Sequence, residues 1–258
     1  MKVVFSKYQG TGNDFILLDN LNGLYNELSI ENICFLCDRK FGIGADGLIK
    51  INKMKGYSFE VEYFNSDGSK SFCGNGARCA VHFAGSLGIP TEEVRFWAID
   101  GEHLAFCNKD EVRLKMIDVE RILKVGEDFE VYTGSQHYIH FTNDLSTENT
   151  VRFGKEIRYS EAYEKNGINV NLMEKISFNQ FRVSTYERGV EDETLSCGTG
   201  VTACAIVADF LSEEPLHEVS IDVKGGKLSV SLERDGDTYR NIYLIGPASF
   251  VFNGEINL

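Results

Sequence analysis

The chain has 258 residues, of which 43% are hydrophobic and 25% are charged, an ordinary composition for a globular protein. Its formal net charge of −13 argues against nucleic-acid binding, because that binding depends on basic side chains that neutralise phosphates. No apolar run reaches the ~18–20 residues of a membrane span, and the first residues lack a signal-peptide pattern. We therefore expect a cytoplasmic protein with no membrane partner.

The first half of the chain predicts strands around two helices. Ser29 is a plausible N-cap for a helix over 29–39, and an apolar run over 77–87 predicts a second helix, which Pro90 stops. Alternating or continuous apolar runs predict strands at 3–5, 15–19, 48–52 and 58–64. Residues 93–117 are expected to form a strand followed by a hairpin of 102–107 and 111–116. Glycines and polar residues at 10–14 form a turn between the first two strands, which places polar side chains at a strand end.

The second half repeats this order of elements. Its one predicted helix covers 201–211, and strands are expected at 129–133, 138–141, 168–174, 180–185, 218–223, 227–234 and 239–245. We expect an α+β fold of two pseudo-symmetric domains, each a curled, mostly antiparallel sheet around a central helix, with the active site in the cleft between them. The predicted domains are 1–117 and 118–248, and the last strand, 249–258, is expected to rejoin the first domain.

A cysteine followed by glycines stands before the central helix of each half. Residues 71–79 read S-F-C-G-N-G-A-R-C and residues 196–204 read S-C-G-T-G-V-T-A-C. Cys73 and Cys197 are 197 − 73 = 124 positions apart, close to half the chain. A helix N-terminus carries partial positive charge and free N–H groups, which lower a cysteine pKa and can hold a carboxylate.

Two such thiols suit the inversion of a carbon next to a carboxylate. One thiolate removes the proton from one face, and the other thiol delivers a proton to the opposite face. The alternative for each loop alone is a packed helix cap with an inert, buried cysteine. The matched pair at half-chain spacing favours the catalytic interpretation.

Two further signals flank the second cysteine. Glu187 and Arg188 follow a predicted strand and could hold a zwitterion, with Arg for carboxylate and Glu for ammonium, although a surface ion pair is the alternative. His137 lies in a turn before a strand and could tune the ionisation of a thiol, although a lone histidine is usually structural.

Two other motifs are interpreted as structural. G-I-G-A-D-G at 42–47 fits a dinucleotide fingerprint, but it follows a helix and precedes a strand, the reverse of the required order. Cys34 and Cys37 lie within a helical pattern with no second pair, which favours packed cysteines over redox or zinc roles. The histidines share no metal-ligand spacing, so no metal is predicted.

The sequence resembles the diaminopimelate epimerase family over essentially its whole length. The motifs that carry the resemblance are G-T-G-N-D-F at 10–15, D-R-K-F-G-I-G-A-D-G at 38–47, F-N-S-D-G-S at 64–69, C-G-N-G-A-R-C at 73–79, E-R-G at 187–189 and C-G-T-G at 197–200. The resemblance implies an epimerase that needs no cofactor and interconverts LL- and meso-diaminopimelate, on the route to lysine and peptidoglycan. It also implies the two-domain fold and a homodimer.

The resemblance also implies roles for individual residues. Cys73 and Cys197 would be the acid–base pair, and His137 and Glu187 would tune the thiols. The residues implied to hold the non-reacting end of the substrate are Asn13, Asn65, Asn169, Glu187 and Arg188. Those implied to seat the reacting carboxylate are Gly74, Asn75, Gly198 and Thr199.

The sequence departs from the family pattern in places, and two alternatives stay open. Ser135 and Gln136 precede His137 where the family commonly has X-Pro, and Phe252 stands where some relatives have a tyrosine at the dimer contact. One alternative is a two-cysteine proline or hydroxyproline racemase, although those relatives typically carry His where this chain has Asn75. The other is a non-catalytic binding relative, which would generally lack the paired cysteines.

Overall fold

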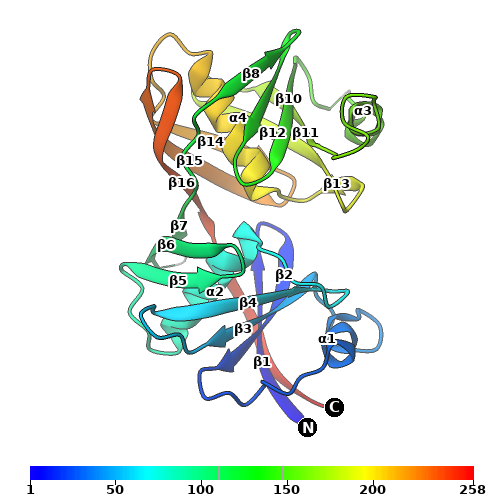
Figure 1. The fold of residues 1–258 in the computed structure, drawn as a ribbon, viewed down its shortest axis with the longest axis vertical. Coiled ribbons are helices and arrows are strands. Elements are labelled where there is room, and N and C mark those ends of the chain that lie inside the picture. Colours follow the sequence, from blue (N-terminus) through cyan, green and yellow to red (C-terminus); the bar gives the residue numbers. More distant parts are fainter. Residues whose placement is uncertain (110, 147) are drawn as a thin grey trace. The chain divides into compact units, whose positions relative to one another are not determined.

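The computed structural model describes residues 1–109, 111–146 and 148–258, and these divide into two compact units (Figure 1). The first unit consists of Met1–Leu114 together with Gly246–Leu258, and the second of Lys115–Ile245. The domain boundaries expected from the sequence, 1–117 and 118–248, stay a prediction.

The first unit is a mixed sheet in the order β17–β1–β2–β3–β4–β5–β6–β7. Its elements are β1 (Lys2–Gly10), β2 (Asn13–Asn20), α1 (Ile30–Cys37), β3 (Gly47–Asn52), β4 (Phe59–Asn65), α2 (Gly74–Ser86), β5 (Val94–Ala98), β6 (Gly101–Asn108), β7 (Glu111–Lys115) and β17 (Ser249–Asn257). The pairs β2–β3 and β4–β5 are parallel and the other neighbours are antiparallel. Parallel neighbours need a crossover connection, and α1 and α2 lie in these two connections.

The second unit has the same topology, in the order β8–β9–β10–β11–β12–β14–β15–β16. Its elements are β8 (Ile122–Val125), β9 (Asp128–Tyr132), β10 (Gln136–Thr142), α3 (Thr150–Arg158), β11 (Asn169–Lys175), β12 (Gln180–Glu187), β13 (Asp192–Thr194), α4 (Gly198–Phe210), β14 (Glu218–Val223), β15 (Gly226–Asp235) and β16 (Thr238–Pro247). Here β10–β11 and β12–β14 are the parallel pairs, α3 and α4 are their crossover helices, and β13 is an extra strand on β12.

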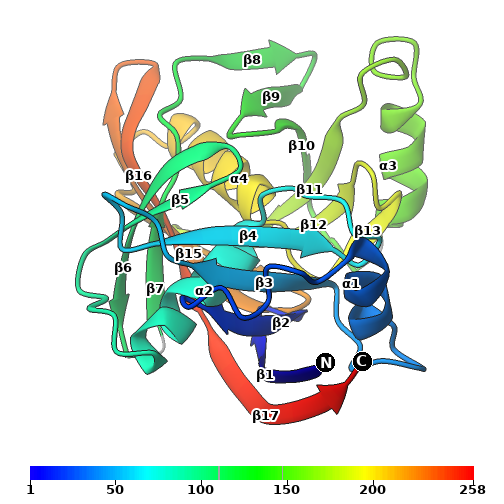
Figure 2. The same cartoon turned by 60° about the horizontal axis from the view of Figure 1, so that its bottom comes forward.

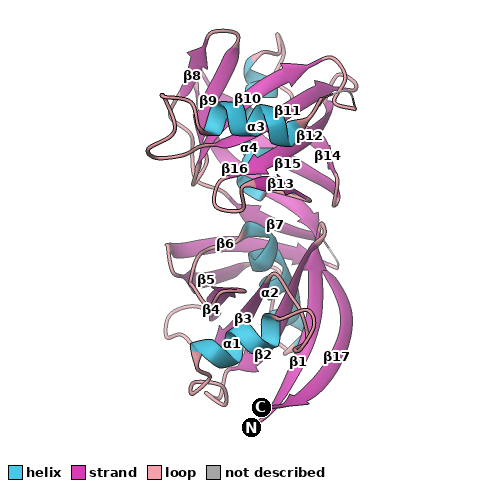
Figure 3. Ribbon diagram, turned by 90° about the vertical axis from the view of Figure 1, so that its right-hand side faces the viewer, coloured by secondary structure: helices cyan, strands magenta, loops and turns pink. Residues whose placement is uncertain are grey.

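In each unit, helices cover parts of the sheet. Helix α2 contacts β1–β4 and β6, and α4 contacts β9–β12, β14 and β15, so each sheet curls around its own central helix (Figures 2 and 3). The shorter helices α1 and α3 pack against a separate apolar cluster of their own unit. In β2 the run 15–18 is fully buried because alternate side chains point to opposite faces: Ile16 and Leu18 join the α1 cluster, and Phe15 lies near Gly76 of α2.

The predicted fold class, an α+β protein of mostly antiparallel sheets around central helices, is therefore confirmed. The two central helices begin earlier than predicted, at Gly74 and Gly198 instead of Ala77 and Val201. Glycines disfavour a helix interior, but the first-turn N–H groups have no helical partner, so the low helix propensity of glycine carries less weight there.

Three elements were missing from the sequence prediction. These are α3, β8 and β13, which are short. The signal for α3 was present, since Asn149 caps the helix by accepting from the N–H of Arg152. In the described ranges, no helix is long and apolar enough to cross a membrane.

Candidate active site

Cys73 is the N-cap residue of α2, directly after the loop that follows β4. Its backbone is extended (φ −132°, ψ 117°), and its carbonyl accepts the first helical bond, from the N–H of Ala77, at 2.8 Å. The side chain is half-buried. Gly74, predicted to help seat a carboxylate, is the first residue of the helix.

Cys197 occupies the same place in the second unit. It is the N-cap of α4 with φ −122° and ψ 107°, and its carbonyl accepts from the N–H of Val201 at 2.9 Å. Only 7% of its surface is exposed. Gly198 begins the helix, so both predicted cysteine loops have one geometry: an extended thiol residue, then glycine, then the N–H groups of a first turn.

In the first unit, the predicted substrate-binding amides lie next to the cysteine helix. The side-chain amide of Asn75 donates to Oδ1 of Asn13 at 2.9 Å, and Asn13 in turn donates to Asp46 at 2.6 Å. Asn65, at the end of β4, accepts from the hydroxyl of Ser71 at 3.2 Å. The structure therefore brings Asn13 together with Asn75, and it ties Asn65 to the loop that leads to Cys73.

In the second unit, a buried polar cluster joins three of the predicted residues. Nε2 of His137 lies 2.9 Å from Oγ1 of Thr199 and 2.8 Å from Oγ of Ser135, and Asn169 donates to the same Ser135 oxygen at 3.1 Å. Thr199 Oγ1 lies 3.5 Å from Sγ of Cys197. His137 is thus linked to Cys197 through a threonine hydroxyl.

The environment of His137 keeps its ring neutral. Burial lowers its pKa to about 3. The amide nitrogen of Asn171 lies 3.1 Å from Nδ1 and also donates to the carbonyl of Tyr138, which leaves Nε2 as the protonated nitrogen. The sequence argument relied on titration of His137 near neutrality, and this burial removes that argument. The tuning of the thiols by His137 stays a prediction.

The Glu187 and Arg188 side chains have different surroundings. Burial raises the pKa of Glu187, which is half-buried at the end of β12. Arg188 is exposed; its guanidinium donates to the carbonyl of Asn166 at 3.0 Å, and its backbone N–H donates to Oδ1 of Asn169 at 2.9 Å. Asn169 and Arg188 are therefore neighbours, as a shared binding role requires.

Comparison with known proteins identifies the family. The sequence profile described as diaminopimelate epimerase matches residues 5–120 and 129–251. The chain belongs to the diaminopimelate epimerase family. A diaminopimelate epimerase from Flavobacterium psychrophilum is 45% identical over 97% of this chain and 98% of its own length, and one from Chlorobaculum tepidum is 40% identical over 96% and 99%.

Solved structures share the fold of this family member at low identity. A PhzF-family phenazine biosynthesis protein from Bacillus anthracis has a TM-score of 0.77 at 13% identity, with both chains fully covered. A probable proline racemase from Agrobacterium radiobacter has a TM-score of 0.67 at 14% identity, over 99% of this chain and 93% of its own. These likenesses show the fold alone.

Three residues of the second-unit cluster were missed by the sequence prediction as site residues: Ser135, Asn171 and Thr185. Thr185 donates to Oδ1 of Asn171 at 2.9 Å, which fixes the amide that contacts His137. A signal for Asn171 existed, because it stands two residues after Asn169 on one strand and so projects from the same face.

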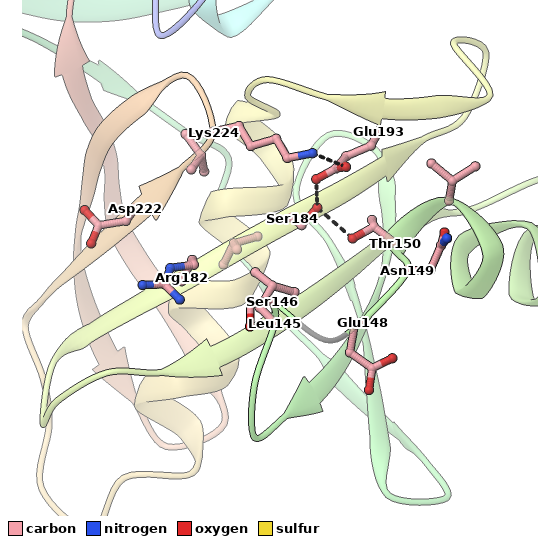
Figure 4. A pocket seen from close by; sticks show the side chains of 13 residues that line it. Leu145, Ser146, Glu148, Asn149, Thr150, Arg182, Ser184, Glu193, Asp222 and Lys224 are labelled. Carbon is pink, nitrogen blue, oxygen red and sulfur yellow. Dashed lines mark hydrogen bonds and ion pairs between the residues drawn. The ribbon is translucent and has the colours of Figure 1, made fainter.

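A separate cavity of this epimerase-family chain lies in the second unit, and Figure 4 shows its lining. Its volume is about 790 Å³, and it is lined by the start of α3 and by parts of β12, β13 and β14, with none of the predicted site residues. Lys224 pairs with Glu193, and Arg182 pairs with Glu174 at 2.9 Å. Both cations of its described lining are therefore held in ion pairs. Among the described residues, no group of three or more potential metal ligands occurs.

Proposed function

We propose that the chain interconverts LL- and meso-diaminopimelate by two-base epimerisation without a cofactor, in the supply of lysine and peptidoglycan precursors. The observation that carries the proposal is the pair of thiols at matching helix starts in a member of the diaminopimelate epimerase family. The relatives with 40–45% identity carry that name, and the family match covers most of the chain.

In the proposed mechanism, Cys73 and Cys197 act on opposite faces of the reacting carbon. The thiolate takes the α-proton and becomes a thiol, while the other thiol gives its proton and becomes a thiolate. The two cysteines therefore exchange protonation states in each turnover, and the reverse reaction starts with their roles exchanged. Each acid–base step contributes ~10²–10⁴-fold. Negative charge that develops on the carboxylate is stabilised by the N–H groups at the two helix starts.

The remaining predicted residues are proposed to bind substrate. Gly74, Asn75, Gly198 and Thr199 supply the first turns of α2 and α4 and would seat the reacting carboxylate. The residues proposed for the distal amino-acid end are Asn13, Asn65, Asn169, Glu187 and Arg188. The Asn169–Arg188 hydrogen bond supports this assignment, because it joins two of the residues proposed for the distal end. The Asn13–Asn75 hydrogen bond makes one residue of each set neighbours.

Hydrogen exchange in D₂O tests the function. LL-diaminopimelate incubated with the protein should give meso product carrying deuterium at the α-carbon, detected by NMR and mass spectrometry. Absence of both product and deuterium would refute the proposal. Turnover of proline instead would assign the chain to the two-cysteine racemases.

We also propose a homodimer formed through β17. This strand pairs on one side with β1. Its residues Phe250, Val251 and Phe252 are 45–51% exposed, and three exposed large apolar side chains in a row are unusual on an edge strand. Val251→Lys should convert a dimer into a monomer in light-scattering measurements of mass. A wild-type chain that is monomeric at micromolar concentration would contradict the assembly without affecting the assigned reaction.

A further inference from the structure

Arg78 in α2 has a fully buried guanidinium with no carboxylate partner among the residues that the structure describes. It stands five residues after Cys73 and has 0% exposure. Its Nη2 donates to the hydroxyl of Thr11 at 3.2 Å, Nε lies 3.5 Å from the carbonyl of Pro247, and within the described residues Nη1 has no hydrogen-bond partner. Arginines are almost never fully buried unless paired, because removal of the charge from water is costly.

The guanidinium lies close to the start of α2. A Cβ on Gly10 would lie 3.6 Å from Nη2 of Arg78, 3.2 Å from the carbonyl oxygen of Asn75 and 3.3 Å from Sγ of Cys79. The side chain therefore folds toward the N-terminus of its helix, as helical side chains do. It packs under the same β1–β2 turn that carries Asn13, the partner of Asn75.

The acids near this turn are already neutralised. Asp14 on β2 pairs with Lys7 at 2.7 Å and with Arg39 at 2.6 Å, and Asp46 pairs with Arg39 at 2.7 Å. The groups that interact electrostatically with Arg78 are the thiols of Cys79 and Cys73 on the same helix, and the phenol of Tyr8 on β1 interacts in turn with Cys79. All three groups are uncharged when protonated.

Of these groups, Cys73 is the one suited to carry a negative charge beside Arg78. Burial raises the pKa of Cys79 to about 12 despite the opposing effect of Arg78, and burial also raises the pKa of Tyr8. Cys73 is only half-buried and has the helix start beside it. Burial lowers the pKa of Arg78 itself, whereas ionised Cys73 and Cys79 would raise it.

We infer that Arg78 is a positioning residue whose buried charge favours the thiolate form of Cys73 over that of Cys197. The inference rests on the proposed function only in treating Cys73 as a reacting thiol. At the matching position of α4 stands Thr202, which is buried, neutral and bonded to the carbonyl of Gly198 at 2.9 Å. The two thiols therefore share a backbone geometry, but the side chain five residues later in the helix is a cation in α2 and a neutral hydroxyl in α4.

The test is the pH dependence of alkylation of each thiol in the full-length chain without substrate. Iodoacetamide labelling of Cys73 and Cys197 is followed by peptide mass spectrometry from pH 5 to 10. Wild-type Cys73 should reach half-maximal labelling at a lower pH than Cys197. Cys197 ionising at an equal or lower pH would overturn the inference, and this measurement needs no variant.

Substitutions test whether Arg78 causes the difference in ionisation between the two thiols. Arg78→Gln should slow Cys73 labelling at pH 7 by about tenfold or more, because an opposite charge nearby shifts a pKa by roughly 1–3 units. Arg78→Lys keeps the charge and should stay near wild type, and Thr202→Val is the matched neutral control in α4. A folded Arg78→Gln protein, judged by circular dichroism, with an unchanged Cys73 profile would refute the role. Because no turnover is measured, an inactive enzyme would refute the proposed function and leave this result standing.

Discussion

The starts of α2 and α4 have the same backbone and different surroundings. Cys73 and Cys197 agree within about 10° in both φ and ψ, and each precedes a 13-residue helix. The first helix starts beside the hydrogen-bonded amides of Asn13 and Asn75 and a buried arginine, whereas the second starts beside a hydrogen-bonded cluster around the neutral His137. The two units share the backbone geometry that presents a thiol, while the neighbouring residues give each thiol its own electrostatic environment.

The largest effect on activity is expected when one of the two thiols is removed at a time. Cys73→Ala and Cys197→Ala should each lower the conversion of LL- to meso-diaminopimelate by ~10²–10⁴-fold, because each face of the carbon needs its own acid or base. Coupled product assays measure this rate. Cys34→Ala, at a half-exposed cysteine outside both loops, is the control and should retain the wild-type rate.

Either cysteine variant with near-normal turnover would break the proposed equivalence of the two helix starts. It would assign both proton transfers to a single group.

Substitution of a glycine in the first turn of each central helix should change the stability of the fold by an intermediate amount. A Cβ at Gly200 would collide with Oδ1 of Asn171 and approach Cε1 of His137 at 3.3 Å, whereas at Gly76 it would meet the terminal methyl of Ile49 at 3.1 Å. Gly200→Ala should destabilise the fold by about 1–3 kcal/mol through overpacking. Gly76→Ala should change stability by less than about 1 kcal/mol, since the Ile49 methyl can move and alanine favours a helix.

Urea unfolding of both glycine variants measures these differences. Equal losses would show that the polar cluster under α4 adapts as readily as the apolar side chains near α2.

The pH dependence of stability gives a further test at the neutral His137. Its folded-state pKa, about 3, lies below the ordinary value near 6.5, so the unfolded chain binds more protons between these values. Its contribution therefore stabilises the fold above pH ~6.5 and is lost as the pH falls toward 3, by up to ~1.4 kcal/mol per pH unit. His137→Gln should flatten the loss of stability between pH 7 and 5, measured as the difference from wild type.

An unchanged slope in His137→Gln would mean that the imidazole is accessible to protons in the folded state. The surroundings of Cys197 would then be closer in polarity to those of Cys73 than the burial of His137 indicates.

The sequence alone determined the features that depend on local pattern. Apolar periodicity located the core strands and both central helices, because strand burial and helical amphipathicity involve neighbouring residues, although each helix begins three residues earlier than predicted. The repeated order of elements also indicated the duplication. Family motifs then named the reaction and the residues proposed to perform it.

Only the tertiary structure decided the surroundings of each thiol. The partners of Arg78, namely Thr11 and Pro247, are 67 and 169 residues away in the chain, and His137 meets Thr199 across 62 residues. Burial and charge compensation depend on such long-range contacts, which no local pattern encodes. For that reason the two cysteines look equivalent in the sequence, and only the folded chain places a buried cation beside one and a neutral imidazole near the other.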